Sequence, residues 1–394
     1  MKILQLIPDL RIGGAERVVV MLANGLRRSG HDSVVTMIHG AHQELVPTLE
    51  IDQRSKLSCL GIRRRSVLKP FGFARDRKRL INLISGLIQE QKPDLVITHL
   101  PEEGFWANAG VRRTGIGRYV PFIQNSVFHL NHYPGDPRTL VRKRLIKANL
   151  KSASRIVAVS EATRQSVIDW CGVAPDHVMV LRNGVDFKPF VDMPRRSYAR
   201  NQLSLPAAAP VILGLGRLVS QKDFGTLVRA SVHVLKSRPQ AIFTIYGEGA
   251  ERKNLEAQIR KLGVEKSWRL PGIQIEPALC LAAADVFCQP SKHEGFSVAI
   301  AEAMAGEAAV VTTNFAGVTE QVVDRVSGLI VPVEDDRRLA GAILELLFNA
   351  KLGKRLGRSA REIAMKNFGA GSFIQRFEEL MMPLIQGSSV ANYK

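Results

Sequence analysis

Two carboxylates near the end of the chain lie on either side of a predicted helix start. Glu294 stands in a loop, Gly295 follows it, and Glu302 falls eight residues later within a run rich in Ala, Met and Ile that is typical of a helix. The preceding residues 285–288 are apolar and predict a buried strand. A strand, a glycine turn and a helix N-terminus together present unpaired backbone N–H groups that bind anions. Carboxylates beside such an anion site suit a ligand that also carries hydroxyl groups, such as a ribose or another sugar.

Two cations follow an earlier predicted strand and fit the same ligand. Arg217 and Lys222 come directly after the apolar run 211–216. At the carboxyl end of a strand they can meet a diphosphate. The sequence has no Asp-x-Asp and no compact cluster of carboxylates or histidines. We therefore expect these cations and helix-end N–H groups to neutralise the diphosphate without a metal ion or other cofactor.

Polar residues also end the predicted strands of the first half. Gly14 lies in a Gly-Gly turn after strand 3–7, where the missing Cβ lets a ligand approach the backbone. Taken alone, a Gly-Gly pair favours a plain tight turn. His99 ends strand 94–99, Gln124 ends strand 119–124, and Asn125 and Ser126 follow it. Ligands bind at strand carboxyl ends in open α/β sheets. His99, Gln124, Asn125 and Ser126 are therefore site candidates, and His99, Asn125 and Ser126 are candidates for acceptor or sugar contacts. A structural role for His99 is the alternative.

The order of predicted strands and helices indicates an α/β protein with two doubly wound domains. A chain of 394 residues is too long for one ordinary core. Strands alternate with helices from the N-terminus, and a second series begins at residue 211. Prolines on either side of a polar stretch predict a linker at 191–209. The predicted domains are thus 1–190 and 210–370, followed by a helix at 371–386.

The charge of the chain lies mostly in its first half. The net charge is +19, and residues 1–200 hold 32 Lys and Arg against 17 Asp and Glu. Segment 54–79 mixes these cations with apolar residues, as in a helix on an anionic membrane surface, and equally as in a solvated domain edge. With few aromatic side chains beside the charge, no nucleic-acid partner is expected. No apolar run is long enough to span a membrane, and four scattered cysteines suit a reduced, cytoplasmic setting, free or peripheral on the inner membrane face.

The motifs, taken in order, resemble the retaining glycosyltransferases of family 4, which have the GT-B fold. The resemblance covers about the whole chain and is most specific in the two glutamates with seven residues between them. The segments that carry it are Gly13-Gly14-Ala15-Glu16, Val157-Ala158-Val159-Ser160, Asn183-Gly184-Val185-Asp186, Gly216-Arg217-Leu218, Lys222-Asp223, and Glu294 through Met304. The resemblance implies two Rossmann-like domains facing across a cleft. The C-terminal domain binds a nucleotide-sugar, the N-terminal domain binds the acceptor, and the final helix returns to the N-terminal domain.

The resemblance also assigns roles to individual residues. Glu302 is expected on the ribose hydroxyls and Glu294 near the donor sugar. Arg217 and Lys222 hold the diphosphate, so these two cations and Glu294 form the catalytic set. The donor-binding set is Gly14, Arg217, Lys222, Glu294, Gly295, Phe296, Ser297, Val298 and Glu302, with Phe296, Ser297 and Val298 offering backbone groups and Gly14 approaching from the other domain.

Two positions depart from the family pattern. Many relatives have a histidine where this chain has Asn125, and an asparagine can hydrogen-bond a sugar but cannot act as a general base. Relatives often read Ala-x-Gly after the last motif helix, whereas here Gly306 directly follows Ala305, so the helix-ending glycine is displaced by one position.

The expected activity is transfer of a sugar from a nucleotide-diphosphate sugar, with a UDP-sugar favoured, to a glycan or lipid-linked acceptor of polysaccharide, lipopolysaccharide or glycolipid synthesis. The configuration at the anomeric carbon is retained by a same-face displacement, and the leaving diphosphate is stabilised electrostatically. Two alternatives stay open. One is another GT-B enzyme, such as a nucleotide-sugar epimerase or a phosphorylase, and the other is a catalytically silent sugar-nucleotide binder.

Overall fold

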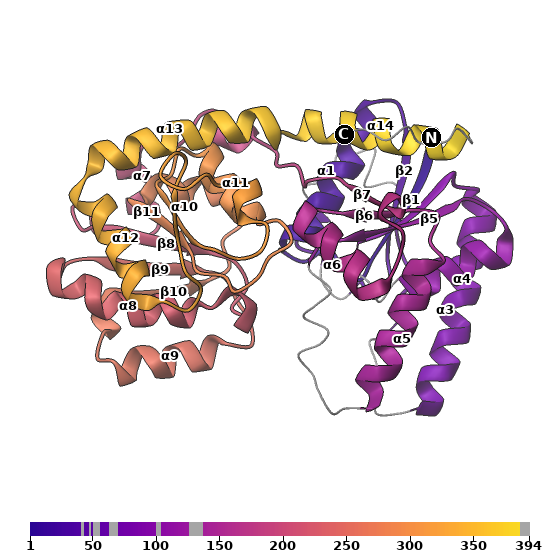
Figure 1. Cartoon of the computed structure of the whole chain (residues 1–394), viewed down its shortest axis with the longest axis horizontal. Coiled ribbons are helices and arrows are strands. Elements are labelled where there is room, and N and C mark those ends of the chain that lie inside the picture. The colour runs from indigo at the N-terminus through magenta and orange to yellow at the C-terminus, as the bar shows by residue number, and fades with distance from the viewer. Residues whose placement is uncertain are drawn as a thin grey trace. The chain divides into compact units, whose positions relative to one another are not determined.

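A computed structural model describes residues 1–40, 43–46, 49, 56–62, 70–99, 104–125 and 137–386, with backbone alone at 70–77 and 137–142. The chain divides into two compact units. Unit 1 comprises Met1–Gly184 together with the segment from Ala370 onward, and unit 2 comprises Val185–Gly369. Figure 1 labels their elements.

Unit 1 is built on a parallel sheet in the order β3-β2-β1-β4-β5-β6-β7. Its strands are β1 (Lys2–Ile7), β2 (Asp32–Met37), β3 (Leu57–Cys59), β4 (Leu95–Thr98), β5 (Arg118–Ile123), β6 (Ile156–Ala158) and β7 (Val178–Val180). Its helices are α1 (Gly14–Arg28), α3 (Pro70–Gln91), α4 (Gly104–Thr114), α5 (Pro137–Lys151), α6 (Glu161–Cys171) and α14 (Ala370–Gln386). Core side chains cover both faces of this sheet, which is why its strands are nearly continuous apolar runs.

Unit 2 repeats the plan with a parallel sheet in the order β10-β9-β8-β11-β12-β13. Its strands are β8 (Val211–Leu215), β9 (Ile242–Tyr246), β10 (Trp268–Gly272), β11 (Val286–Gln289), β12 (Val310–Thr313) and β13 (Leu329–Val331). Its helices are α7 (Arg196–Gln202), α8 (Phe224–Ser237), α9 (Arg252–Lys261), α10 (Pro277–Ala283), α11 (Val298–Ala305), α12 (Asp336–Phe348) and α13 (Ala350–Asn367).

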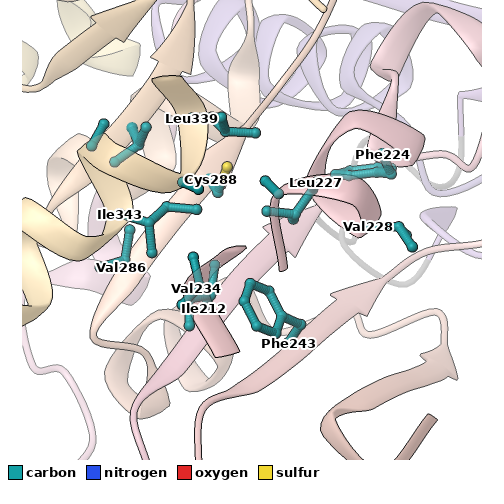
Figure 2. Close-up of a cluster of buried hydrophobic side chains, with 14 of the residues drawn as sticks. Ile212, Phe224, Leu227, Val228, Val234, Phe243, Val286, Cys288, Leu339 and Ile343 are labelled. Atoms are coloured by element: carbon teal, nitrogen blue, oxygen red, sulfur yellow. The ribbon is translucent and has the colours of Figure 1, made fainter. Parts of the chain in front are cut away.

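Alternate residues of the unit 2 strands enter two separate cores. On one face Ile212, Phe243 and Val286 pack with side chains of α8 and α12, as Figure 2 shows. On the other face Val211 and Ile242 pack with residues of α7 and α10. The predicted α/β class with two doubly wound sheets is therefore confirmed.

The predicted linker is wrong. Residues 191–209 contain α7, and Ala199, Leu205 and Ala209 are buried against the unit 2 sheet. Among the prolines that indicated a linker, Pro206 lies in a turn whose carbonyls are bonded, because Arg200 donates to the oxygens of Pro206 and Ala207. The units divide at Gly184, and not near residue 190.

The segment expected as a returning helix, 371–386, lies within α14 and packs on unit 1. Ile374 sits against Gly25 of α1, where an added Cβ would lie 2.4 Å from the Ile374 Cδ1. Glu378 pairs with the His31 ring at 3.0 Å. Phe377 is buried, and its ring centroid lies 6.2 Å from that of Phe122. A small residue in α1 thus makes room for the last helix.

Candidate functional site

Lys222 and Glu294 meet in unit 2 as a largely buried ion pair. The Lys222 Nζ lies 2.6 Å from the Glu294 Oε1, and the two side chains are 14% and 8% exposed. They are far apart in sequence, but β8 and β11 are neighbours in the sheet, so the loops that follow these strands adjoin. Two residues predicted to bind the donor therefore lie in contact.

Polar side chains hold the Glu294 carboxylate from several sides. The Ser291 hydroxyl donates to Oε1 at 2.8 Å and itself accepts from the Gln289 amide at 2.9 Å. Gln221 donates to the His293 carbonyl at 2.9 Å and to the Glu294 Oε2 at 3.4 Å. A carboxylate bound by a cation and several donors is oriented and weakened as a nucleophile.

The loop after β8 is shaped by close backbone contacts. Gly216 has φ +140, and a Cβ on Gly247 would lie 1.9 Å from the Gly216 carbonyl oxygen, so glycine is required at both positions. The Arg217 side chain is exposed. Lys222 ends a short 3₁₀ turn, and Asp223 after it adopts a left-handed φ of +45. Burial raises the pKa of the Asp223 carboxyl, which accepts a hydrogen bond from the Thr226 hydroxyl.

The N-terminus of α11 is capped by Ser297. The Ile300 N–H donates to the Ser297 Oγ at 3.4 Å. The Gln321 side chain accepts from the Ser297 N–H at 2.9 Å and donates to the Ser297 carbonyl at 3.0 Å. The Ser297 N–H is thus bonded to Gln321, and the expectation that Ser297 offers backbone groups to the donor stays a prediction. Within the part of the chain that the structure describes, the N–H groups of Val298 and Ala299 donate no hydrogen bond to a capping side chain or a loop carbonyl.

The remaining donor candidates in unit 2 lie around the same loop and helix. Glu302, one turn into α11, is 7% exposed. Burial, and secondly the charge of Glu302, raises the pKa of the Cys280 thiol on α10 to about 12, so the carboxylate faces α10. Gly295 and Phe296 are buried, and the Phe296 ring meets Phe368 edge-on at 5.2 Å between centroids. Phe296 thus anchors the loop, and Val298 is half-buried at the helix start.

Unit 1 carries the remaining candidates, which follow its strands or begin its first helix. Gly14 is the exposed first residue of α1. His99 is fully buried after β4, its Nε2 lies 3.0 Å from the Gln5 Oε1, and burial lowers its pKa to about 3. This burial favours the structural role for His99 and not a contact with the acceptor. Asn125 is half-buried after β5, and Ser126 lies outside the described residues.

Sequence reasoning missed Asn183, which comes after β7. It is 2% exposed, and its amide donates to the Gln124 Oε1 at 2.9 Å. The Asn183 Oδ1 and the Gln124 Nε2 are buried without a hydrogen-bond partner among the described residues. The motif Asn183-Gly184 was visible in the sequence, but nothing in it indicates that the asparagine reaches Gln124 at the end of β5, two strands away in the sheet.

Among the described residues, no group of three or more His, Cys, Asp and Glu side chains is arranged to hold a metal ion. Within the same residues no helix combines the length and apolarity needed to cross a membrane. Most side chains of the basic segment 54–79, with its expected surface role, lie outside the described residues.

Solved structures share this fold over nearly the whole chain. The Anabaena protein Alr3699/HepE, in complex with UDP and glucose, is 21% identical with a TM-score of 0.82 over 97% of this chain and 99% of its own. Sucrose-phosphate synthase from Thermosynechococcus elongatus is 21% identical with a TM-score of 0.83 over 98% and 100%. At these identities the similarity shows the fold, which is the GT-B arrangement of two α/β units.

Curated relatives match over shorter stretches. D-inositol 3-phosphate glycosyltransferase from Kineococcus radiotolerans is 30% identical over 60% of this chain and 59% of its own. Lipopolysaccharide core biosynthesis glycosyltransferase LpsE from Rhizobium meliloti is 32% identical over 46% and 52%. An Escherichia coli enzyme, UDP-Gal:alpha-D-GlcNAc-diphosphoundecaprenol alpha-1,3-galactosyltransferase, is 23% identical over 79% and 80%. The matched region spans a little over half the length of the first two relatives.

Two family models cover most of the sequence. Residues 12–188 match Glycosyltransferase Family 4, and residues 196–363 match Glycosyl transferases group 1. The first match lies almost entirely in unit 1 and the second lies in unit 2. Because each unit matches a glycosyltransferase family model, the chain belongs to the group 1 glycosyltransferases of the GT-B fold.

Proposed function

We propose that this protein is a glycosyltransferase that transfers a hexosyl group from a nucleotide-diphosphate sugar, preferably a UDP-sugar, to a glycan or lipid-linked acceptor. The observation that carries the proposal is the buried Lys222–Glu294 pair next to the N-terminus of α11. Cation, helix-end N–H groups and a fixed carboxylate suit a diphosphate joined to a sugar. The names of the curated relatives, which include a UDP-galactose enzyme and a lipopolysaccharide enzyme, support the same substrates.

The proposed reaction retains configuration by displacement on one face of the sugar. The acceptor hydroxyl attacks the anomeric carbon, the bond from that carbon to the leaving phosphate oxygen breaks, and this oxygen takes the acceptor proton. Lys222, Arg217 and the N–H groups of Val298 and Ala299 stabilise the negative charge on the leaving diphosphate. A covalent route through Glu294 is less suitable, because its carboxylate is held by Lys222 and by the Ser291 hydroxyl.

We propose that the reaction needs no metal ion. The cations of the β8 loop and the helix-end dipole supply the positive charge that Mg²⁺ supplies in other enzymes of diphosphates. Glu302, largely buried on α11, is the proposed ligand of the ribose hydroxyls. A thermal-shift screen of nucleotide sugars with and without EDTA tests both points, because a ligand that binds the native protein raises its melting temperature. A shift that disappears in EDTA contradicts metal independence.

Substitutions in and beside the donor loop, residues 290–297 between β11 and α11, test the assignment of the site. We expect Lys222→Ala to reduce transfer by at least about a hundredfold, the scale seen when one preorganised group facing transition-state charge is removed. We expect Glu302→Ala to reduce transfer severely, because the donor ribose loses its proposed ligand. The matched control is Lys292→Ala, since Lys292 is in the loop but is 40% exposed and pairs with Glu334. The control keeps its activity. Normal turnover by a folded Lys222→Ala or Glu302→Ala variant contradicts the proposal.

Product analysis separates the remaining functions. NMR of the product fixes the anomeric configuration, so an inverted product contradicts the retaining route. An epimerase converts the nucleotide sugar without acceptor, a phosphorylase consumes phosphate, and a silent binder gives a thermal shift but no product. Sedimentation with anionic phospholipid vesicles tests whether the basic first half of the chain holds the enzyme at a membrane surface, as a lipid-linked acceptor requires.

A further inference from the structure

We propose that Gln321 is a positioning residue for donor binding, a role that rests on the proposed function. Its side chain forms two hydrogen bonds with the backbone of Ser297, one accepted from N–H at 2.9 Å and one donated to the carbonyl at 3.0 Å. The primary amide of Gln321 thereby pairs with one residue of the loop as a neighbouring strand would. It fixes the position of the residue where the donor loop becomes α11.

The pair is buried and firmly supported. Gln321 is 2% exposed and Ser297 is 1% exposed, so both hydrogen bonds are shielded from water. The Gln321 backbone N–H bonds the Val318 carbonyl at 2.9 Å, and Val318 and Val322 on either side are fully buried. The side chain is thus attached to the core of unit 2. An amide held this way resists rotation of the loop about Ser297.

The Gln321 amide also determines which helix-end N–H groups remain for a ligand. A helix start leaves several N–H groups without an intrahelical partner. The Ser297 N–H donates to the Gln321 side-chain oxygen, and the Ile300 N–H donates to the Ser297 hydroxyl. Among the described residues, the N–H groups of Val298 and Ala299 donate no hydrogen bond to a side chain or to a loop carbonyl. The Gln321–Ser297 pair therefore leaves two adjacent N–H donors for a ligand and fixes their direction. A phosphate oxygen bound there depends on a side chain that it does not touch.

Neutrality is the second reason for a glutamine at this position. A glutamate has the same shape and can accept from the Ser297 N–H, but in its ionised form it cannot donate to the Ser297 carbonyl. Its charge also opposes an anion at the helix N-terminus. Only the protonated acid reproduces the donor and acceptor of the amide. The role of Gln321 therefore predicts that a glutamate substitution becomes sensitive to pH.

Binding of UDP, measured by calorimetry on the whole chain, tests the proposal. Gln321→Met fills the same space without the two hydrogen bonds, and we expect it to weaken UDP binding about tenfold, the scale of one well-made bond to a charged group. The matched control is Ser231→Ala, because the Ser231 hydroxyl accepts from the buried Trp268 Nε1 at 2.9 Å elsewhere in unit 2. Both variants lose buried hydrogen bonds and melt at a lower temperature, but only Gln321→Met changes the affinity.

The pH dependence of UDP binding by Gln321→Glu distinguishes a role in donor binding from a purely structural role. The ratio of its UDP dissociation constant to that of the wild type should fall towards one as the pH is lowered from 8 to 5.5, because the buried acid becomes protonated. A ratio that does not vary with pH, or a Gln321→Met variant that binds UDP as tightly as the Ser231→Ala control, overturns the proposal. If the wild type itself binds neither UDP nor another nucleoside diphosphate, it is the proposed function that fails.

Discussion

The fully buried His99 should make unit 1 sensitive to mild acid. Burial lowers the pKa of its imidazole from 6.5 to about 3, so the ring stays neutral in the folded protein. The unfolded chain takes up a proton near pH 6.5 that the folded chain cannot accept. The stability that the neutral ring contributes is therefore fully present above pH 6.5 and is lost as the pH falls from there towards 3.

The size of this effect follows from the two pKa values. At pH 7 the unfolded histidine is mostly neutral, whereas at pH 5 it is almost fully protonated while the folded one is not. Linkage then gives a loss of about 2 kcal/mol in the free energy of unfolding between pH 7 and pH 5 from this one side chain. His99→Gln removes the titrating group and keeps an N–H donor for the Gln5 Oε1, which lies 3.0 Å from the native ring nitrogen.

Urea unfolding followed by tryptophan fluorescence can measure unit 1 alone. In a Trp268→Phe background the two remaining tryptophans, Trp106 and Trp170, both belong to unit 1. The wild-type side chain and His99→Gln are compared in that background at pH 7 and pH 5. His99→Gln starts from a lower stability at pH 7 but should lose about 2 kcal/mol less on acidification. Equal losses for both proteins would refute the reasoning, and a change confined to acceptor binding would restore the ligand role for His99.

Three further substitutions have expected outcomes. Glu307, just after α11, has the left-handed φ of +55. Glu307→Gly should therefore raise the free energy of unfolding by about 1 kcal/mol, whereas Glu307→Ala keeps the strain and should not raise it. Urea titration of the two variants measures the difference. Arg200 is buried and bonds Asp285 and three carbonyls, so Arg200→Ala should cost about 3–5 kcal/mol in the same assay. The control Arg196→Ala, on the same carboxylate but 48% exposed, should cost under about 1 kcal/mol, and similar losses for both would contradict this account. Ser291→Ala removes a hydroxyl bound to the Glu294 Oε1, so kcat should fall about tenfold. The melting temperature should fall as well, because the Gln289 amide loses its acceptor; an unchanged kcat would show that the carboxylate does not need this bond.

The architecture was predictable because its signals are local. Runs such as 211–215 are apolar without alternation, as parallel strands covered on both faces must be, and the glycine turns mark where helices begin. The glycine at 306 was also readable, and the structure places Glu307, the residue after it, in the left-handed region. The linker was mispredicted because prolines look the same in a free segment and in a turn whose carbonyls a buried arginine binds.

The contacts within the site were not predictable to the same degree. Nothing in the sequence says that β8 lies beside β11, so the meeting of Lys222 with Glu294 depends on sheet order. Gln321 is one of many glutamines until its distance to Ser297 is known. The burial of His99 is likewise a property of three dimensions, since a polar residue at a strand end faces a ligand in one protein and the core in another.

The discontinuity of unit 1 bears on how the chain matures. Unit 2 is continuous, whereas unit 1 lacks α14 until all of unit 2 has been synthesised. At ordinary elongation rates the ribosome needs roughly 10 to 40 seconds for that interval. During this time the surfaces that Ile374 and Phe377 later cover, around Gly25 and Phe122, stay exposed on the nascent chain. Unit 1 is thus the first unit to be started and the last to be completed. Its uncovered apolar surface is the kind of surface that chaperones bind.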